Sequence, residues 1–255
     1  MEMTFNGYIM NPMGTKNAVF SQRDMYKKLY TEKLDKILLR EGGKFTYTLY
    51  KDSTSNRYFC HIKVPSEVIE KFYYDVVIMF YTTNPNLKGE KTLKNYFVKF
   101  YSNDPSFVYT FAYAFNKNEL VIEDLITKMS KRSIEQEASI RNPQSIIGYV
   151  KSLYFAYLII QKYGLFEKIN YTVKAKRYSK RALLNDIVPA DTKVADRQEA
   201  EEKLQAKKKR EKLKASNPIN NFASNTVKKV IPISKTKTVS KNSKKVPTIK
   251  TIKKK

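Results

Sequence analysis

The chain has few of the residues from which most enzyme sites are built. Among its 255 residues are one histidine, His61, one cysteine, Cys60, and no tryptophan. The two residues are neighbours in a predicted strand, where successive side chains point to opposite faces of a sheet. An ordinary zinc cluster or an ordinary Ser/His/Asp or Cys/His triad is therefore not expected, and we predict structural roles for both residues.

Glycine-rich phosphate loops and long apolar runs are also missing. The seven glycines fall into neither the GxxxxGK(S/T) nor the GxGxxG pattern, so nucleotide hydrolysis is not expected. The longest apolar run, residues 153–160, is too short for a membrane span, which takes about 20 residues. A lone cysteine excludes an internal disulfide, and no charged and then apolar leader opens the sequence, which predicts synthesis in a reducing cytoplasm.

Acidic residues are absent from the carboxy-terminal end. No Asp or Glu follows Glu211, and residues 212–255 carry 13 lysines, no arginine and one aromatic residue, Phe222. Such a segment buries too little apolar surface to offset the entropy of ordering, so we predict a disordered tail. Because lysine lacks the forked geometry of arginine, the tail predicts salt-sensitive contact with an acidic partner that is independent of sequence.

The positive charge is concentrated in the last third of the chain. Residues 1–168 hold 24 Lys and Arg against 17 Asp and Glu, whereas residues 169–255 hold 25 against 7. A solubilising appendage is the alternative explanation, but charge of one sign at one end favours a binding role. The candidate residues for binding nucleic acid or an acidic partner are Lys174, Lys176, Arg177, Lys180, Arg181, Lys207, Lys208, Lys209, Arg210, Lys228, Lys229, Lys235, Lys237, Lys244, Lys245, Lys253, Lys254 and Lys255.

The pattern of apolar residues in the first two thirds predicts an α+β fold. Ser21 and Asp24 form a capping box before a helical run that Gly42-Gly43 ends, which predicts a helix over about residues 22–40. Runs of alternating, β-branched or aromatic residues then predict a mostly antiparallel sheet of four to five strands. These runs are residues 45–50, 57–64, 73–81, 96–101 and 107–115.

Further helices are predicted to pack on this sheet. Residues 119–129 have the spacing of a short amphipathic helix, and residues 65–67 open one or two helical turns. Asn142-Pro143 supplies a cap and a first-turn proline for a long helix that Gly164 closes. The second half of this helix is apolar almost all round, so we predict that it is buried against the sheet as the central element of the core.

The patterns divide the chain into four parts. Residues 1–20 have turn signals and no clear period, which predicts an extended N-terminal arm. Residues 21–185 form the predicted α+β globular domain. Residues 186–215 form a charged exposed helix, capped by Asp191, with acids first and lysines second as the helix dipole favours. Residues 216–255 are the Lys-rich disordered tail.

Two weaker patterns suggest other activities. Residues 94–101 resemble the aromatic strand with which RNA-recognition folds stack bases, although a half-buried strand shows the same alternation. Lys99 and Tyr101 would serve this purpose only on an open face. Asp75, Glu123 and Asp124 would suit a metal-dependent nuclease if they met at a sheet edge, but their spacing matches no known motif. We therefore expect no enzyme activity, no cofactor and no metal.

The stretch FNGYIMNPMGTK, residues 5–16, runs into the first predicted helix and resembles proteins of tailed bacteriophages with AT-rich genomes. The resemblance covers about residues 5–165. It implies a non-catalytic structural or assembly component of a virion, from the head, neck or tail, made in the host cytoplasm. The implied partners are other virion subunits, further copies of the chain in a homo-oligomer, and packaged DNA through the tail, with no membrane and no small-molecule substrate. An accessory nucleic-acid-binding protein with salt-sensitive, sequence-independent binding is the alternative.

Overall fold

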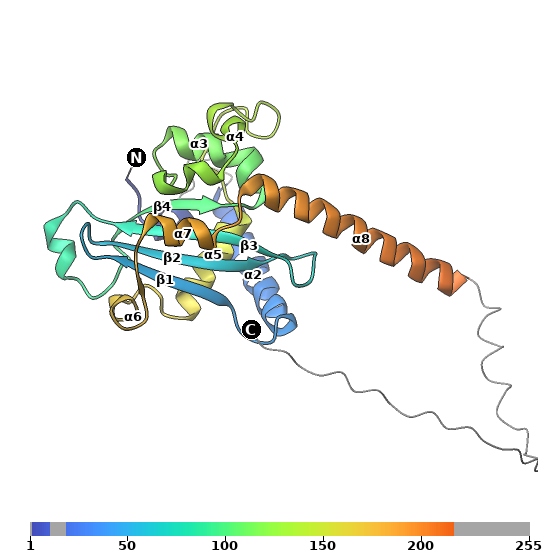
Figure 1. Cartoon of the computed structure of the whole chain (residues 1–255), viewed down its shortest axis with the longest axis horizontal. Helices are drawn as coiled ribbons and strands as arrows, with labels where there is room; N and C mark the ends of the chain where they lie inside the picture. The colour runs from blue at the N-terminus through green and yellow to red at the C-terminus, as the bar shows by residue number, and fades with distance from the viewer. Residues whose placement is uncertain (1, 11–18, 217–255) are drawn as a thin grey trace, which may run out of the picture. The chain divides into compact units, whose positions relative to one another are not determined.

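Five strands form one sheet in the order β4-β3-β2-β1-β5 (Figure 1). Strands β1 to β4 are antiparallel neighbours, and β5 runs parallel to β1. The computed structural model describes residues 2–10 and 19–216, and it describes side chains in residues 2–10 and 29–213. The α+β fold class predicted from the sequence is confirmed. The strands are β1 (Thr46–Asp52), β2 (Arg57–Pro65), β3 (Tyr73–Tyr81), β4 (Phe97–Ser102) and β5 (Lys176–Arg177).

Helices make up the rest of the regular structure. The strands β1 to β4 match the predicted runs to within two residues at each end, whereas several helices differ from the predictions. The α-helices are α1 (Phe5–Met10), α2 (Val19–Arg40), α3 (Ala112–Lys117), α4 (Lys131–Glu135), α5 (Lys151–Lys162), α6 (Lys168–Val173), α7 (Lys180–Asp186) and α8 (Ala190–Ser216). Two 3-10 helices, η1 (Pro85–Gly89) and η3 (Glu123–Lys128), and one π-helix, η2 (Phe107–Phe111), complete the described part.

Both faces of the sheet are covered. Helices α1 and α5 pack on the face that carries Cys60 and Phe100, whereas Tyr178, just before α7, stacks on Phe59 of the other face with ring centroids 4.3 Å apart. His61 lies on this second face, which confirms that it and Cys60 point in opposite directions. Burial on both faces explains why the sequences of β2 and β3 are almost continuously apolar.

Residues 5–10 form helix α1, so the prediction of an extended arm was wrong for this part of residues 1–20. Phe5 and Tyr8 are fully buried, and their rings lie 5.3 and 5.0 Å from that of Phe100. The Tyr8 hydroxyl donates to the Gly148 carbonyl (3.0 Å) and accepts from the Val150 amide (3.1 Å). The burial of two aromatic rings outweighs the turn preference of Asn-Gly in the same stretch.

The run 107–115 is helical, so its prediction as the fifth strand was wrong. It forms η2 and the first part of α3. Phe107 and Phe115 are buried with their rings 5.2 Å apart, while Tyr109 between them is 44 % exposed. The aromatic residues that favour a strand here pack on one side of a helical segment. Strand propensity is weak compared with packing, so the tertiary contacts determine the backbone conformation. The fifth strand is β5, from a distant part of the chain.

Residues 120–122 run beside β4, where an amphipathic helix over residues 119–129 was predicted. The Phe100 amide donates to the Leu120 carbonyl (2.7 Å), and the Ile122 amide donates to the Phe100 carbonyl (3.1 Å). The Val98 amide donates to the Met3 carbonyl (2.9 Å), so two segments pair with the outer edge of β4. The apolar residues at 120 and 122 thus belong to an extended stretch, and only η3 after it is helical.

Helix α5 is buried against β2 and β3 as predicted, but it begins at Lys151 and not after Asn142. The Asn142 side chain instead holds a turn. Its amide group donates to the Thr110 and Ile146 carbonyls (3.1 and 2.8 Å), and its oxygen accepts from the Ile146 amide (2.9 Å). These local bonds compete with a helix for the same backbone groups, which explains the later start.

Helix α2 ends where Gly42-Gly43 predicts its end. Both glycines have positive φ angles (79° and 83°), and the Gly43 amide donates to the Leu38 carbonyl (2.8 Å), which closes the last turn. The helix begins at Val19, so the capping box predicted at Ser21 was wrong. Residues 65–67 open no helix, so this prediction was wrong: bends and a turn follow Ser66, whose hydroxyl accepts from the Val68 and Ile69 amides (3.3 and 3.2 Å).

The charged helix predicted over residues 186–215 is α8, with Asp191 in its first turn and not at its cap. Its first turns contact the compact part: Ala190 is fully buried, and the Lys193 amine lies 4.4 Å from the centre of the Phe72 ring. The described residues up to Lys207 belong to one compact unit. None of the helices in the described ranges combines the length and apolar character needed to cross a bilayer.

Candidate functional site

The first part of the predicted basic site lies on α6, β5 and α7. Lys174, Lys176, Arg177, Lys180 and Arg181 are all exposed. Strand β5 fixes their place, because Arg177 is in register with Lys51 of β1 and the Tyr178 amide donates to the Lys51 carbonyl (2.9 Å). We call these five residues the basic edge. The structure therefore places this local cluster of the sequence beside β1, at one edge of the sheet.

Tyr178 anchors the basic edge to the sheet. Its ring stacks on Phe59 with an interplanar angle of 4°, and the Arg57 guanidinium lies 5.6 Å from its centre. Its hydroxyl donates to the Asp124 carboxylate (2.5 Å). Burial alone would raise the pKa of Asp124, but hydrogen bonds from Tyr178 and Lys180 outweigh it and hold that pKa below its usual value. The sequence analysis missed this role, because Tyr178 looks like any other tyrosine of the chain.

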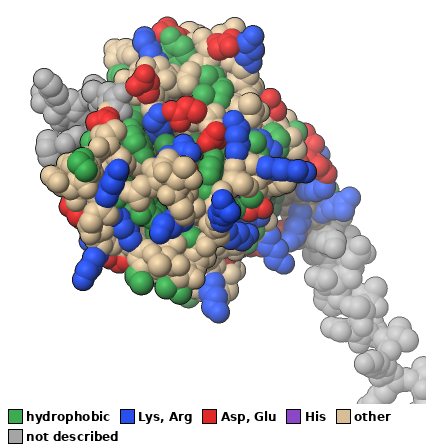
Figure 2. All heavy atoms as spheres, turned by 60° about the vertical axis from the view of Figure 1, so that its left-hand side comes forward, with side chains coloured by type: hydrophobic (Ala, Val, Ile, Leu, Met, Phe, Trp, Pro, Cys, Tyr) green, Lys and Arg blue, Asp and Glu red, His purple; other side chains and the backbone are tan. Residues whose placement is uncertain are grey.

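Two residues of the basic edge have acidic neighbours and three do not. The Lys180 amine lies 3.2 Å from the Asp124 carboxylate, and the Lys176 amine lies 3.9 Å from that of Asp186. No carboxylate within the described residues pairs with Lys174, Arg177 or Arg181, so their charge is available to an external anion. The face of the molecule that Figure 2 shows carries Lys and Arg side chains interspersed with Asp and Glu.

The remaining predicted basic residues follow in α8 and beyond it. Lys207, Lys208, Lys209 and Arg210 are exposed on consecutive positions of the helix. The lysines predicted between Lys228 and Lys255 lie outside the described residues. The strongest excess of positive charge therefore remains a property of the sequence after Glu211.

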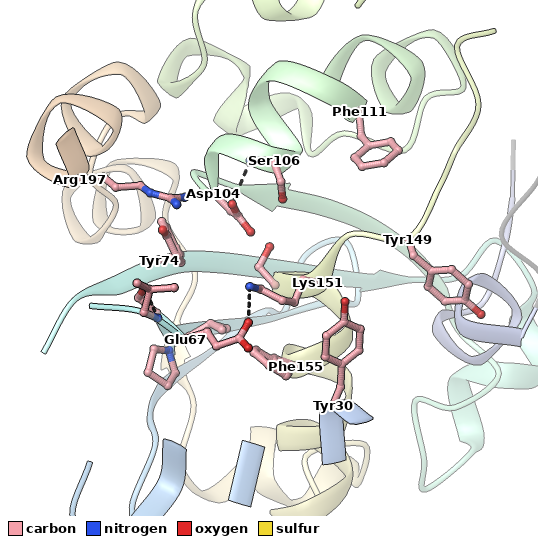
Figure 3. Close-up of a pocket in the computed structure, with 15 residues that line it drawn as sticks. Tyr30, Glu67, Tyr74, Asp104, Ser106, Phe111, Tyr149, Lys151, Phe155 and Arg197 are labelled. Carbon is pink, nitrogen blue, oxygen red and sulfur yellow. Dashed lines mark hydrogen bonds and ion pairs between the residues drawn. The ribbon is translucent and has the colours of Figure 1, made fainter. Parts of the chain in front are cut away.

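A pocket of about 360 Å³, which the sequence did not indicate, opens at one end of the sheet (Figure 3). Charged side chains from distant segments meet there: Glu67 follows β2, Asp104 follows β4, Lys151 begins α5, and Arg197 comes from α8. Aromatic residues form much of the remaining wall. These are Tyr30, Tyr74, Phe111, Tyr149 and Phe155.

The charges around this pocket are partly matched. The Glu67 carboxylate pairs with two amines, those of Lys33 (2.6 Å) and Lys151 (2.8 Å), and these pairs hold its pKa below the usual value although burial acts in the opposite direction. Arg197 pairs with Glu201 four residues later in α8 (2.7 Å). Asp104 is 5 % exposed and has no Lys or Arg nitrogen of the described residues within 4.0 Å.

The three carboxylates considered for a nuclease do not meet. Asp75 is buried and accepts hydrogen bonds from the Asn103 side chain (3.0 Å) and the Val188 amide (3.1 Å), while the His61 ring lies at 2.9 Å. Glu123 pairs with Lys99, and Asp124 belongs to the basic edge. Within the part of the chain that the structure describes, no three His, Cys, Asp or Glu side chains gather as a metal site would require.

The base-stacking surface suggested for residues 94–101 is also absent. Tyr101 is fully buried, and its hydroxyl reaches the Val188 carbonyl (3.4 Å). Lys99 pairs with Glu123 and lies over the ring of Tyr81 (5.8 Å). The hypothesis was wrong because Tyr101 is buried beneath the segment before α8 and the Lys99 amine is held by Glu123. Comparison with protein-family models, with curated proteins and with solved structures gives no match to this chain.

Proposed function

We propose that this chain is a non-catalytic binding and assembly protein that holds nucleic acid through its basic carboxy-terminal third. The observation that carries the proposal is the separation of charge: no acidic residue follows Glu211, while 13 lysines do. Lysines spread over an acid-free segment attract a phosphate backbone without reading bases. The basic edge adds Lys174, Arg177 and Arg181, three exposed cations that pair with no carboxylate of the described residues.

The compact unit serves as the scaffold in this proposal. Its carboxylates are largely occupied by local partners: Glu67 pairs with two lysines, Asp75 contacts His61, and Asp124 binds Tyr178 and Lys180. Such side chains hold the fold together and are not free for proton transfer. This supports the non-catalytic part of the proposal, together with the absence of phosphate-loop motifs from the sequence.

The setting that we propose is a phage virion or its assembly, with packaged DNA and neighbouring subunits as partners. The support is the resemblance of residues 5–16 and of the Tyr- and Phe-rich strands to proteins of tailed phages. Mass spectrometry of purified particles tests this directly. Stoichiometric presence of the chain agrees with the proposal. Its absence from particles and from assembly intermediates would leave only the accessory nucleic-acid-binding role.

Salt dependence tests the nucleic-acid proposal. We expect the logarithm of the affinity for duplex DNA to fall linearly with the logarithm of salt concentration, with a slope of about −0.9 for each phosphate neutralised. Deletion of residues 212–255 should remove most of that slope, and unrelated DNA sequences should bind alike. Fluorescence anisotropy of labelled duplexes over a salt series measures both.

Two full-length controls separate charge from chain length. Replacement of the 13 lysines after Glu211 by glutamine should act like the deletion, whereas replacement by arginine should keep the slope. Neutralising Lys174, Arg177 and Arg181 together should reduce it by a smaller amount. If the deletion leaves affinity and slope unchanged, the proposal fails. If polyglutamate binds as tightly as DNA at equal charge, the partner is an acidic protein and not nucleic acid.

A further inference from the structure

The pocket in Figure 3 contains the buried Asp104 carboxylate, which has no Lys or Arg nitrogen of the described residues within 4.0 Å, although the Arg197 guanidinium attracts it from a greater distance. The Asp104 Oδ1 atom accepts from the Ser106 amide (3.0 Å), and no donor of the described residues bonds to Oδ2. Burial of an ionised carboxylate is costly unless a cation or further donors compensate it. The Ser106 side chain, which is also part of the lining, points into the same space (Figure 3). This end of the pocket is suited to the ammonium group of a ligand.

The opposite wall has one positive charge in excess. The single Glu67 carboxylate lies between the amines of Lys33 and Lys151. Lys151 is also the first residue of α5, whose N-cap residue Val150 makes no side-chain capping bond. The backbone amides of Lys151, Ser152 and Leu153 have no acceptor among the described residues. Free amides and the dipole at a helix start favour an anion, so this wall is suited to a carboxylate group.

The remaining wall and the size of the pocket limit the ligand. The rings of Phe111, Tyr149 and Phe155 line the space beside the charged groups. The volume of about 360 Å³ lies near the lower end of the range for small-molecule sites, roughly 300–1,000 Å³. A polymer is too large to be enclosed here, whereas a single zwitterion with an apolar group fits.

We infer that this pocket binds a free amino acid with an apolar side chain. Its ammonium group pairs with Asp104, its carboxylate lies beside Lys151 and the start of α5, and its side chain contacts the aromatic wall. The inference is independent of the nucleic-acid proposal and differs from the expectation that the chain has no small-molecule partner. It also gives a reason for the arrangement of charges, since each end of the ligand meets a side chain of opposite charge.

Ligand-observed NMR with the full-length chain tests this inference. The probes are L-leucine, L-methionine and L-phenylalanine, each with an analogue that lacks one charge; for leucine these are 4-methylpentanoate and 3-methylbutylamine. We expect saturable binding of at least one amino acid, and affinities weaker by about tenfold or more for its analogues, since each loses a charged hydrogen-bonding group. No saturable binding of any of the three at millimolar concentration, or equal binding of the analogues, overturns the inference.

Two variants assign the ends of the ligand. Asp104→Asn should weaken binding of the amino acid by about tenfold while leaving the carboxylate-only analogue unchanged. Lys151→Met should weaken both, because both carry the carboxylate. Glu123→Gln, outside the pocket, is the matched control and should change neither. Unchanged affinity in the Lys151 variant alone refutes the assignment, and this side chain is 38 % exposed, so its replacement tests the site even if Asp104→Asn does not fold.

Discussion

The buried pair of His61 and Asp75 connects the sheet to the segment before α8. Asp75 lies on β3 and bonds to the Val188 amide, and Asn103 donates to the Val188 carbonyl (3.1 Å). Burial would raise the pKa of Asp75, but the His61 contact and the Val188 amide outweigh it, so the pKa lies below its usual value. A group of this kind stabilises the fold only while it is ionised.

Replacing Asp75 by Asn should therefore destabilise the protein in a pH-dependent way. We expect a loss of about 2 kcal/mol or more at pH 7, because hydrogen bonds to an ionised group are replaced by neutral ones. The difference from the unchanged protein should be full above about pH 4, the usual pKa of an aspartate, and should shrink as the pH falls through the lowered pKa. Urea unfolding at several pH values measures this. A difference that grows on acidification would contradict the assigned sign.

Cys60 gives a second prediction at this scale. Its thiol is buried within the sheet, and burial raises its pKa to about 12. Since only the thiolate is nucleophilic, we expect no reaction with a disulfide reagent at pH 8 in the folded protein and full reaction in denaturant. Rapid labelling of the folded protein would show that the strand opens locally. The adjacent position of Cys60 and His61 in the sequence allowed their placement on opposite faces of the sheet to be predicted.

Helix α1 is one of the elements that the sequence did not predict. Phe5→Ala should lower the free energy of unfolding by about 3–5 kcal/mol, because the ring is fully buried against Phe100 and Tyr157. Met10→Ala, at the 40 % exposed end of the same helix, is the control and should cost far less. Chemical denaturation measures both. Equal small effects would mean that residues 5–10 act as the arm that the turn signals predict.

The elements that were predicted correctly are those whose pattern has a single explanation. The runs at 57–64 and 73–81 combine β-branched residues with a length typical of strands, and turns bound them on both sides. The run at 107–115 has the same composition, but an extended backbone would hold Phe107 and Phe115 too far apart for their rings to lie 5.2 Å from each other, as they do in the helical segment. For residues 120–122 the deciding partner is Phe100, which no local pattern identifies.

For the whole molecule, the sequence identified the basic residues but not the pocket. The five residues of the basic edge lie within eight positions of one another, so the sequence alone shows them as a cluster. That charged side chains such as these are exposed can be predicted without knowing which distant segments pack together. The pocket joins Glu67, Asp104, Lys151 and Arg197, which are separated by 37 to 47 positions along the chain. These four residues come together only through the packing of strands and helices, which the sequence pattern of an individual helix or strand does not predict.

The proposed function also predicts how a protease acts on the full-length chain. Limited trypsin digestion of the free protein should first remove lysine-containing fragments after residue 207 and leave a core that begins with α1. Saturating duplex DNA should slow these first cuts without changing the later ones, because contact with the backbone covers the lysines. Mass spectrometry of the fragments identifies the sites. Identical cleavage with and without DNA would argue against binding by this segment.

The paired outer edge of β4 has a consequence for association between copies. Unpaired strand edges are templates onto which a second molecule can add its own strand. Here the amides of Val98 and Phe100 are already satisfied by Met3 and Leu120, so lateral extension of the sheet on that side is blocked. Association of copies through this side must therefore use side-chain contacts, which can dissociate and re-form. It cannot proceed by open-ended addition of strands to a shared sheet.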